Sequence, residues 1–61
     1  MEFVANEIYI DREGNEYRYL ERRQGVQVFE SVVTSKKIVL NLIGRYRWDG
    51  QDHPRDIIGK K

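Results

Sequence analysis

The stretch GRYRWDGQDHPRDIIG, residues 44–59, contains the only tryptophan, proline and histidine of the chain. It predicts a short aromatic strand at Arg45–Trp48, a tight turn at Asp49-Gly50, and then a helical turn capped by the Asp52 carboxylate, which accepts the amide of Arg55. The two isoleucines after this turn and both aromatic rings are expected to point into the core. The residues assigned to this structural motif are Gly44, Tyr46, Trp48, Asp52, Pro54, Ile57 and Ile58.

Upstream of this stretch, apolar residues alternate with polar ones in four further segments, which predicts four strands. These segments are residues 3–10, 16–22, 26–33 and 38–43. Gly14 and Gly25 stand between them, where hairpin turns need positive φ angles. Gly44 must bend the fourth segment, because a strand continuing unbroken from residue 38 to Trp48 would span ~36 Å, too long for so small a domain.

The third predicted strand has a conflict in its pattern. Val28 and Glu30 share one face, whereas Phe29 and Val33 share the other. If the Val28 face is the inner one, Glu30 is buried at a cost unless it is paired. A bulge near Phe29 that rotates the register is the other remedy, and the sequence leaves both open.

These elements predict a single small all-β domain over residues 1–61. The turn spacing favours a meander of about five short antiparallel strands, curved into a small barrel like that of Src-homology-3 (SH3) domains. The alternative is an open twisted sheet, one face of which is covered by a second copy of the chain. Self-association is an early option because 61 residues form a marginal core without help.

The order of the motifs resembles a group of very small, uncharacterised proteins encoded by tailed phages and prophages. The resemblance rests on DREGNEYRYL (residues 11–20), VQVFESV (residues 26–32) and a C-terminal pattern of Gly44-Arg45-Tyr46 followed by DHPRDII, residues 52–58. It implies a compact β fold and a phage or prophage setting. It implies no reaction, because no activity is assigned to the group.

The composition argues against several classes of function. The chain has no cysteine and one histidine, so it lacks the ligands of a zinc site, and we expect no metal and no cofactor. Its few serines and threonines stand in no nucleophile motif, so we expect no enzyme activity. No apolar run could cross a membrane and the first residues are acidic, which predicts a cytoplasmic protein.

Nucleic-acid binding is the second hypothesis for the function. The basic residues that could contact phosphates are Lys36, Lys37, Arg45 and Arg47. Strand alternation would place the two arginines opposite Tyr46 and Trp48, whose rings continue the core face, so the arginines would lack aromatic rings on which bases could stack. The net charge of +1 also argues against a strong nucleic-acid binder.

Protein recognition is the first hypothesis for the function. A small sheet with an open edge can accept another strand, and aromatic faces supply strong contacts. The candidates for an outward aromatic patch are Tyr9, Tyr17, Tyr19 and Phe29. The partner would be a host or phage protein, or a second copy of the chain.

Overall fold

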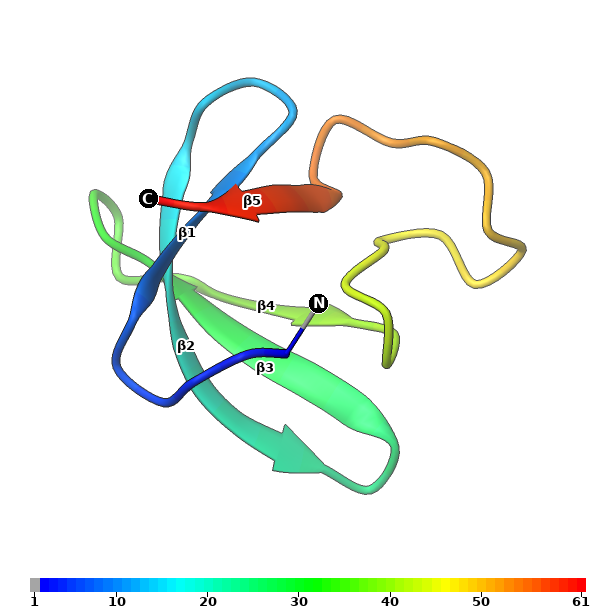
Figure 1. Ribbon diagram of the computed structural model, residues 1–61, viewed down its shortest axis with the longest axis horizontal. Coiled ribbons are helices and arrows are strands. Elements are labelled where there is room, and N and C mark those ends of the chain that lie inside the picture. The colour runs from blue at the N-terminus through cyan, green and yellow to red at the C-terminus, as the bar shows by residue number, and fades with distance from the viewer. Residues whose placement is uncertain (1) are drawn as a thin grey trace.

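The computed structural model describes residues 2–61, which form one antiparallel sheet (Figure 1). Its strands are β1 (Ile8–Asp11), β2 (Glu16–Arg23), β3 (Val26–Ser31), β4 (Lys37–Leu40) and β5 (Ile57–Lys60). The order in the sheet is β4-β3-β2-β1-β5, so the first four strands form a meander and β5 returns to pair with β1. The predicted all-β class with five antiparallel strands is therefore confirmed.

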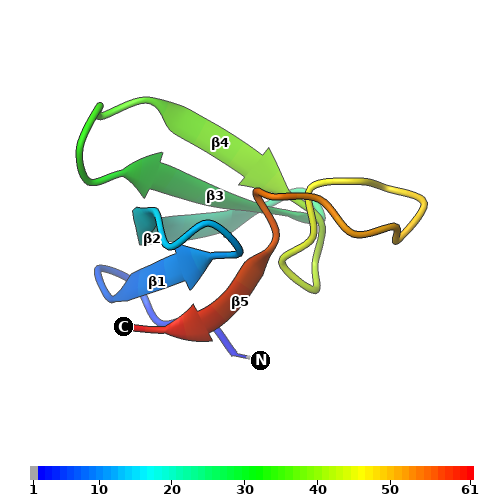
Figure 2. The same cartoon turned by 90° about the horizontal axis from the view of Figure 1, so that it is seen from above.

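The sheet is curved but open, with β4 and β5 at its two edges (Figure 2). Within residues 2–61 these edges do not pair with each other, so the predicted closed SH3-like barrel is wrong. The start of β5 is bonded to the segment that follows β4, because the amide of Ile57 donates to the carbonyl of Gly44 at 2.9 Å. The alternative of an open sheet is confirmed, and the second copy expected to cover it stays a prediction.

Asn41 explains why β4 stops before it can run along β5. Its side-chain Oδ1 accepts the amides of Ile43 at 3.0 Å and Arg45 at 2.9 Å. These bonds turn the backbone out of the strand, and the turn closes when the amide of Gly44 donates to the carbonyl of Asn41. The bend predicted at Gly44 is confirmed by its φ of 83°.

The core lies on the concave face of the sheet, and it consists mainly of aromatic rings. The buried apolar residues are Tyr9, Tyr17, Tyr19, Phe29, Leu40 and Ile57. The outward aromatic patch predicted at Tyr9, Tyr17, Tyr19 and Phe29 is thus wrong, because these four rings are the interior. Turning them inward buries the large rings, whereas the opposite register would bury Arg18.

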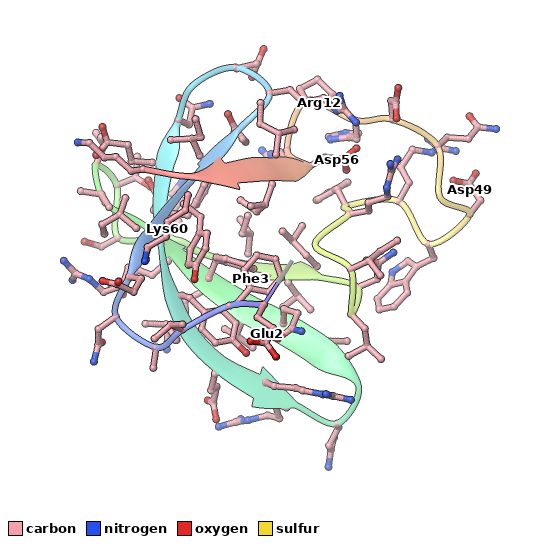
Figure 3. All side chains as sticks on the ribbon, viewed as in Figure 1. Glu2, Phe3, Arg12, Asp49, Asp56 and Lys60 are labelled. Carbon is pink, nitrogen blue, oxygen red and sulfur yellow. The ribbon has the colours of Figure 1, made fainter. Side chains whose placement is uncertain are left out.

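Phe3 covers this core from the N-terminal segment (Figure 3). Its ring centroid lies 5.0 Å from that of Tyr9 and 5.1 Å from that of Phe29, both edge-to-face, and 5.5 Å from that of Tyr19 in a stacked arrangement. The Tyr9 hydroxyl accepts the amide of Val4 at 2.7 Å, which fixes the segment over the rings. One aromatic residue from outside the sheet therefore covers three that belong to it.

The conflict at Glu30 is resolved by the choice of inner face. Phe29 is fully buried, so Glu30 lies on the outer face, where it stands opposite Arg18 on β2 and Lys37 on β4. No buried carboxylate arises there. The β2–β3 pair does have a register irregularity near Phe29, but the extra residue is on the partner strand: it lies on β2 between Tyr19 and Glu21, which pair with Phe29 and Val28.

Candidate interaction surface

Residues 41–56, which we call the Trp48 loop, connect the two edge strands and project beyond the sheet (Figures 1 and 2). The strand predicted at Arg45–Trp48 does not form. The reason is that the amide of Tyr46 donates to the Asp56 carboxylate at 2.8 Å and not to a neighbouring strand. A loop of this length without regular structure is usually either functional or disordered, and this one is held by specific bonds.

Asp56 fixes the base of the Trp48 loop. Its carboxylate is 1% exposed and accepts the amides of Tyr46 and His53, the latter at 2.9 Å. The guanidinium Nε of Arg12, in the turn after β1, donates to the same carboxylate at 3.2 Å. Figure 3 shows Arg12 and Asp56 side by side next to the start of β5. Asp56 thus ties two segments of the loop, at Tyr46 and at His53, to the β1–β2 hairpin.

The environment of Asp56 favours its charged form. Burial alone would raise the pKa of this carboxyl, but the amides of Tyr46 and His53 and the Arg12 guanidinium outweigh burial, and the pKa is lowered. A buried carboxylate with three donors and no unsatisfied oxygen is a structural anchor. The role of Asp56 here is to hold the loop in place.

Asp52 acts differently from the prediction. Its Oδ1 accepts from Arg12 and from Arg45, both at 3.0 Å, and so joins two arginines at the surface. It does not cap the following turn, because the amide of Arg55 donates to the ring Nδ1 of His53 at 3.1 Å. Pro54 lies in that turn and its carbonyl accepts the amide of Arg12, which adds a further link to the hairpin.

The tip of the loop is closed by an ion pair between Arg47 and Asp49. The guanidinium donates to both carboxylate oxygens, at 3.2 and 3.0 Å, and the amide of Gln51 donates to one of them at 3.0 Å. The Arg47 hydrogen bond and that amide lower the pKa of Asp49 to about 2. Figure 3 places Asp49 at the outer end of the loop, far from Asp56.

Large apolar side chains are exposed around this framework. The indole of Trp48 is 68% exposed and Ile43 is 65% exposed, with Leu42 and Tyr46 less so. Ile57 is buried as predicted, but the prediction that Trp48, Tyr46 and Ile58 belong to the core is wrong. Once the chain leaves the sheet after Leu40, strand alternation no longer determines where the aromatic rings point.

Tyr46 is held in place on the surface by a stack of side chains. Its ring lies 4.2 Å from that of His53 at an interplanar angle of 23°, and the guanidinium carbon of Arg55 is 5.4 Å from the Tyr46 centroid. The single histidine therefore supports an aromatic ring. Within the described residues, no group of three or more metal-binding side chains is present.

The four basic residues predicted to contact phosphates do not form one surface. Lys36 and Lys37 lie at the β3–β4 turn, at the opposite end of the sheet from Arg45 and Arg47 (Figures 1 and 2). The two arginines are also engaged with aspartates. The structure thus separates the lysines from the arginines, and it brings the arginines together with the exposed rings of the loop.

Sequence reasoning missed Arg12 and Asp56, which do most to shape the loop. They are 44 positions apart, so no local pattern joins them. The only indication in the sequence of this role was the concentration of aspartates around Pro54, and helix capping was a sufficient explanation for those aspartates. Asp11 was missed as well. Its buried carboxylate accepts the amides of Glu13 and Asn15, both at 2.9 Å, and so builds the β1–β2 turn.

Comparison of the chain with protein-family models, with curated proteins and with solved structures finds no match. The resemblance to small phage and prophage proteins therefore stays a prediction. Among residues 2–61 there is no helix with the length and apolar character that crossing a membrane requires.

Proposed function

We propose that this chain is a non-enzymatic binding module that holds a protein partner on the Trp48 loop. The observation that carries the proposal is the 68% exposure of Trp48 on a loop whose base is fixed by a buried carboxylate. Tryptophan, tyrosine and arginine dominate the binding energy of protein interfaces. A loop that is ordered before binding loses less conformational entropy on association.

The charge of the loop supports a protein partner over a nucleic acid. Residues 41–56 contain three arginines and three aspartates, so their formal charges cancel. Arg45 and Arg47 are each paired with an aspartate, and a phosphate would have to compete with those pairs. Exposed rings beside neutralised charges suit a protein surface with its own polar rim.

The partner we propose is a host or phage protein met in the cytoplasm, in keeping with the resemblance to phage and prophage proteins. A second copy of the chain is the other partner that the fold supports. The sheet ends in two free edges, and Val39 on β4 and Ile58 on β5 are both about half exposed. Free edges and exposed aliphatic residues favour association between copies.

The test compares two single variants, Trp48→Ala and Val33→Ala. Both remove an exposed apolar side chain, but Val33 lies in the β3–β4 turn, at the opposite end of the sheet. A partner captured by the wild-type chain is purified, and its dissociation constant is measured for each variant. We expect Trp48→Ala to weaken binding by ~30-fold or more, as a hot-spot residue does, and Val33→Ala to leave it unchanged.

Equal affinity of the wild type and Trp48→Ala would refute the proposal. Light scattering at two protein concentrations shows whether the partner is a second copy, in which case Trp48→Ala is expected to shift the chain toward the monomer. Titration with single-stranded DNA and RNA at several salt concentrations tests the competing reading. Tight, salt-dependent binding lost in Trp48→Ala would assign the loop to nucleic acid instead.

A further inference from the structure

The aromatic contacts of Phe3 do not reach one end of the concave face of the sheet, between the β1–β2 and β3–β4 turns. Phe3 covers the rings of Tyr9, Tyr19 and Phe29, but the described contacts of its ring do not extend to Tyr17. A groove of about 640 Å³ lies there. This volume is within the ~300–1,000 Å³ typical of small-molecule sites.

The base of the groove is partly apolar. Tyr17 and Ser31 are direct partners on neighbouring strands, and Tyr17 is only 7% exposed. Ile38, at the start of the edge strand β4, is half-buried against the core and also lines the groove. A ring or alkyl group could therefore be placed against Tyr17 and Ile38.

The walls carry cations that form no ion pair in the part of the chain described, although Arg55 also lies over the Tyr46 ring. Lys36 comes from the β3–β4 turn and Arg55 from the segment before β5, and neither belongs to an ion pair among residues 2–61. Lys37 also lines the groove, but strand alternation places its side chain on the outer face of the sheet, beside Glu30. Two carboxylates also line the groove, but that of Glu16 is neutralised by Lys61 at 2.9 Å. The groove thus keeps an excess of positive charge.

Two hydroxyl groups in the same wall are available as donors. The Ser31 Oγ accepts the amide of Thr34 at 3.2 Å, and the Thr34 Oγ1 accepts the amide of Lys36 at 3.3 Å. These bonds use the hydroxyl oxygens as acceptors and leave each O–H free to donate. Donors and cations together are what a phosphate or carboxylate group requires.

We infer that this groove binds a small organic anion that carries a phosphate or carboxylate on an apolar body. The anionic group is held by Lys36 and Arg55, and the apolar body lies against Tyr17 and Ile38. The site is distinct from the Trp48 loop surface, because Arg55 is the one residue of that loop among the groove's lining residues. Binding of an anion in the groove therefore does not depend on the proposed protein partner.

The experiment is an NMR titration of the isotope-labelled chain with three probes: phenyl phosphate, inorganic phosphate and phenol. We expect phenyl phosphate to bind more tightly than either of the others, with saturable shifts at the amides of Tyr17, Ser31 and Ile38. Absence of saturable shifts at these amides would overturn the inference. Equal binding of inorganic phosphate and phenyl phosphate would overturn the role of the apolar base.

Charge-matched single variants show whether Lys36 acts locally. Lys36→Gln removes one positive charge at the groove, and Arg22→Gln removes one at the β2–β3 hairpin. We expect the lysine variant to raise the dissociation constant of phenyl phosphate at least ~10-fold, and the arginine variant to change it by less than ~2-fold. Equal weakening in both would show general attraction to positive charge and refute a built site. The amide spectrum of each variant reports its fold.

Discussion

Replacing Asp56 by asparagine tests whether one buried carboxylate holds the Trp48 loop. An asparagine presents one oxygen and one NH2 group where the aspartate presents two oxygens, so at least one of the amides of Tyr46 and His53 loses its acceptor. Arg12 also loses its buried counter-charge. The Arg12 side chain is 37% exposed, which places the cost of breaking this pair at the lower end of the buried range.

These losses add up to a destabilisation of ~2–4 kcal/mol, since a hydrogen bond to a charged group contributes ~1.5–3 kcal/mol. A core of this size rarely supplies more than ~3–5 kcal/mol, so Asp56→Asn should be close to unfolding in water. With a slope of ~1 kcal/mol per molar urea, the midpoint should fall by ~2–4 M. Far-ultraviolet circular dichroism is the readout, because Trp48 is too exposed to report burial.

Asp49→Asn is the matched control, since it makes the same substitution at the solvated tip of the loop. Its urea midpoint should fall much less than that of Asp56→Asn, because exposed ion pairs contribute little to stability. If Asp56→Asn and Asp49→Asn unfold at the same urea concentration, the carboxylate of Asp56 does not hold the loop and the reasoning fails.

Three further predictions follow from the geometry of the same region. Gly44→Ala should destabilise the chain by ~2–4 kcal/mol, because φ is 83° and the new Cβ would lie 2.8 Å from the Phe3 Cζ. Gly14→Ala, with the same φ and open space around the new Cβ, should cost only ~1–2 kcal/mol. Equal urea midpoints of the two variants would contradict this difference. Folding lowers the pKa of Asp56, so the contribution of this carboxylate to stability is complete above ~pH 4 and is lost as the pH falls through the folded pKa. Thermal unfolding between ~pH 6 and ~pH 2 should show this loss of stability in the wild type and a smaller loss in Asp56→Asn. Parallel stability–pH profiles of the two proteins would contradict the prediction. Acrylamide should quench Trp48 nearly as well in the folded chain as in urea, and strong protection in the folded chain would show that the indole is covered.

The strands could be predicted from sequence because each obeys a local rule. Alternating side chains mark β2 and β3, and Gly25 with Gln24, both at positive φ, forms the two-residue turn between them. Alternation cannot tell which face is the inner one. The choice between burying Tyr19 and burying Leu20 depends on which rings meet across the sheet and on Phe3, which lies outside it.

The Trp48 loop could not be predicted for a related reason. The pattern of arginine and aromatic residues at Arg45–Trp48 is that of a strand, and a local reading has no means of rejecting it. The strand fails because Asn41 and Asp56 take up the amides that a sheet neighbour would need. One of these residues lies ten positions beyond Tyr46, and its own position depends on Arg12 in the first hairpin.

The pairing of β1 with β5 has a consequence for how this chain is made. A ribosome synthesises β5 after the other four strands, so the nascent meander carries β1 as a temporarily vacant edge. Ile8 and Ile10 lie on that strand, and a vacant edge of this kind invites pairing with another nascent chain. Until Ile57–Lys60 pairs with it, β1 is therefore a second edge, besides β4, along which another chain can pair.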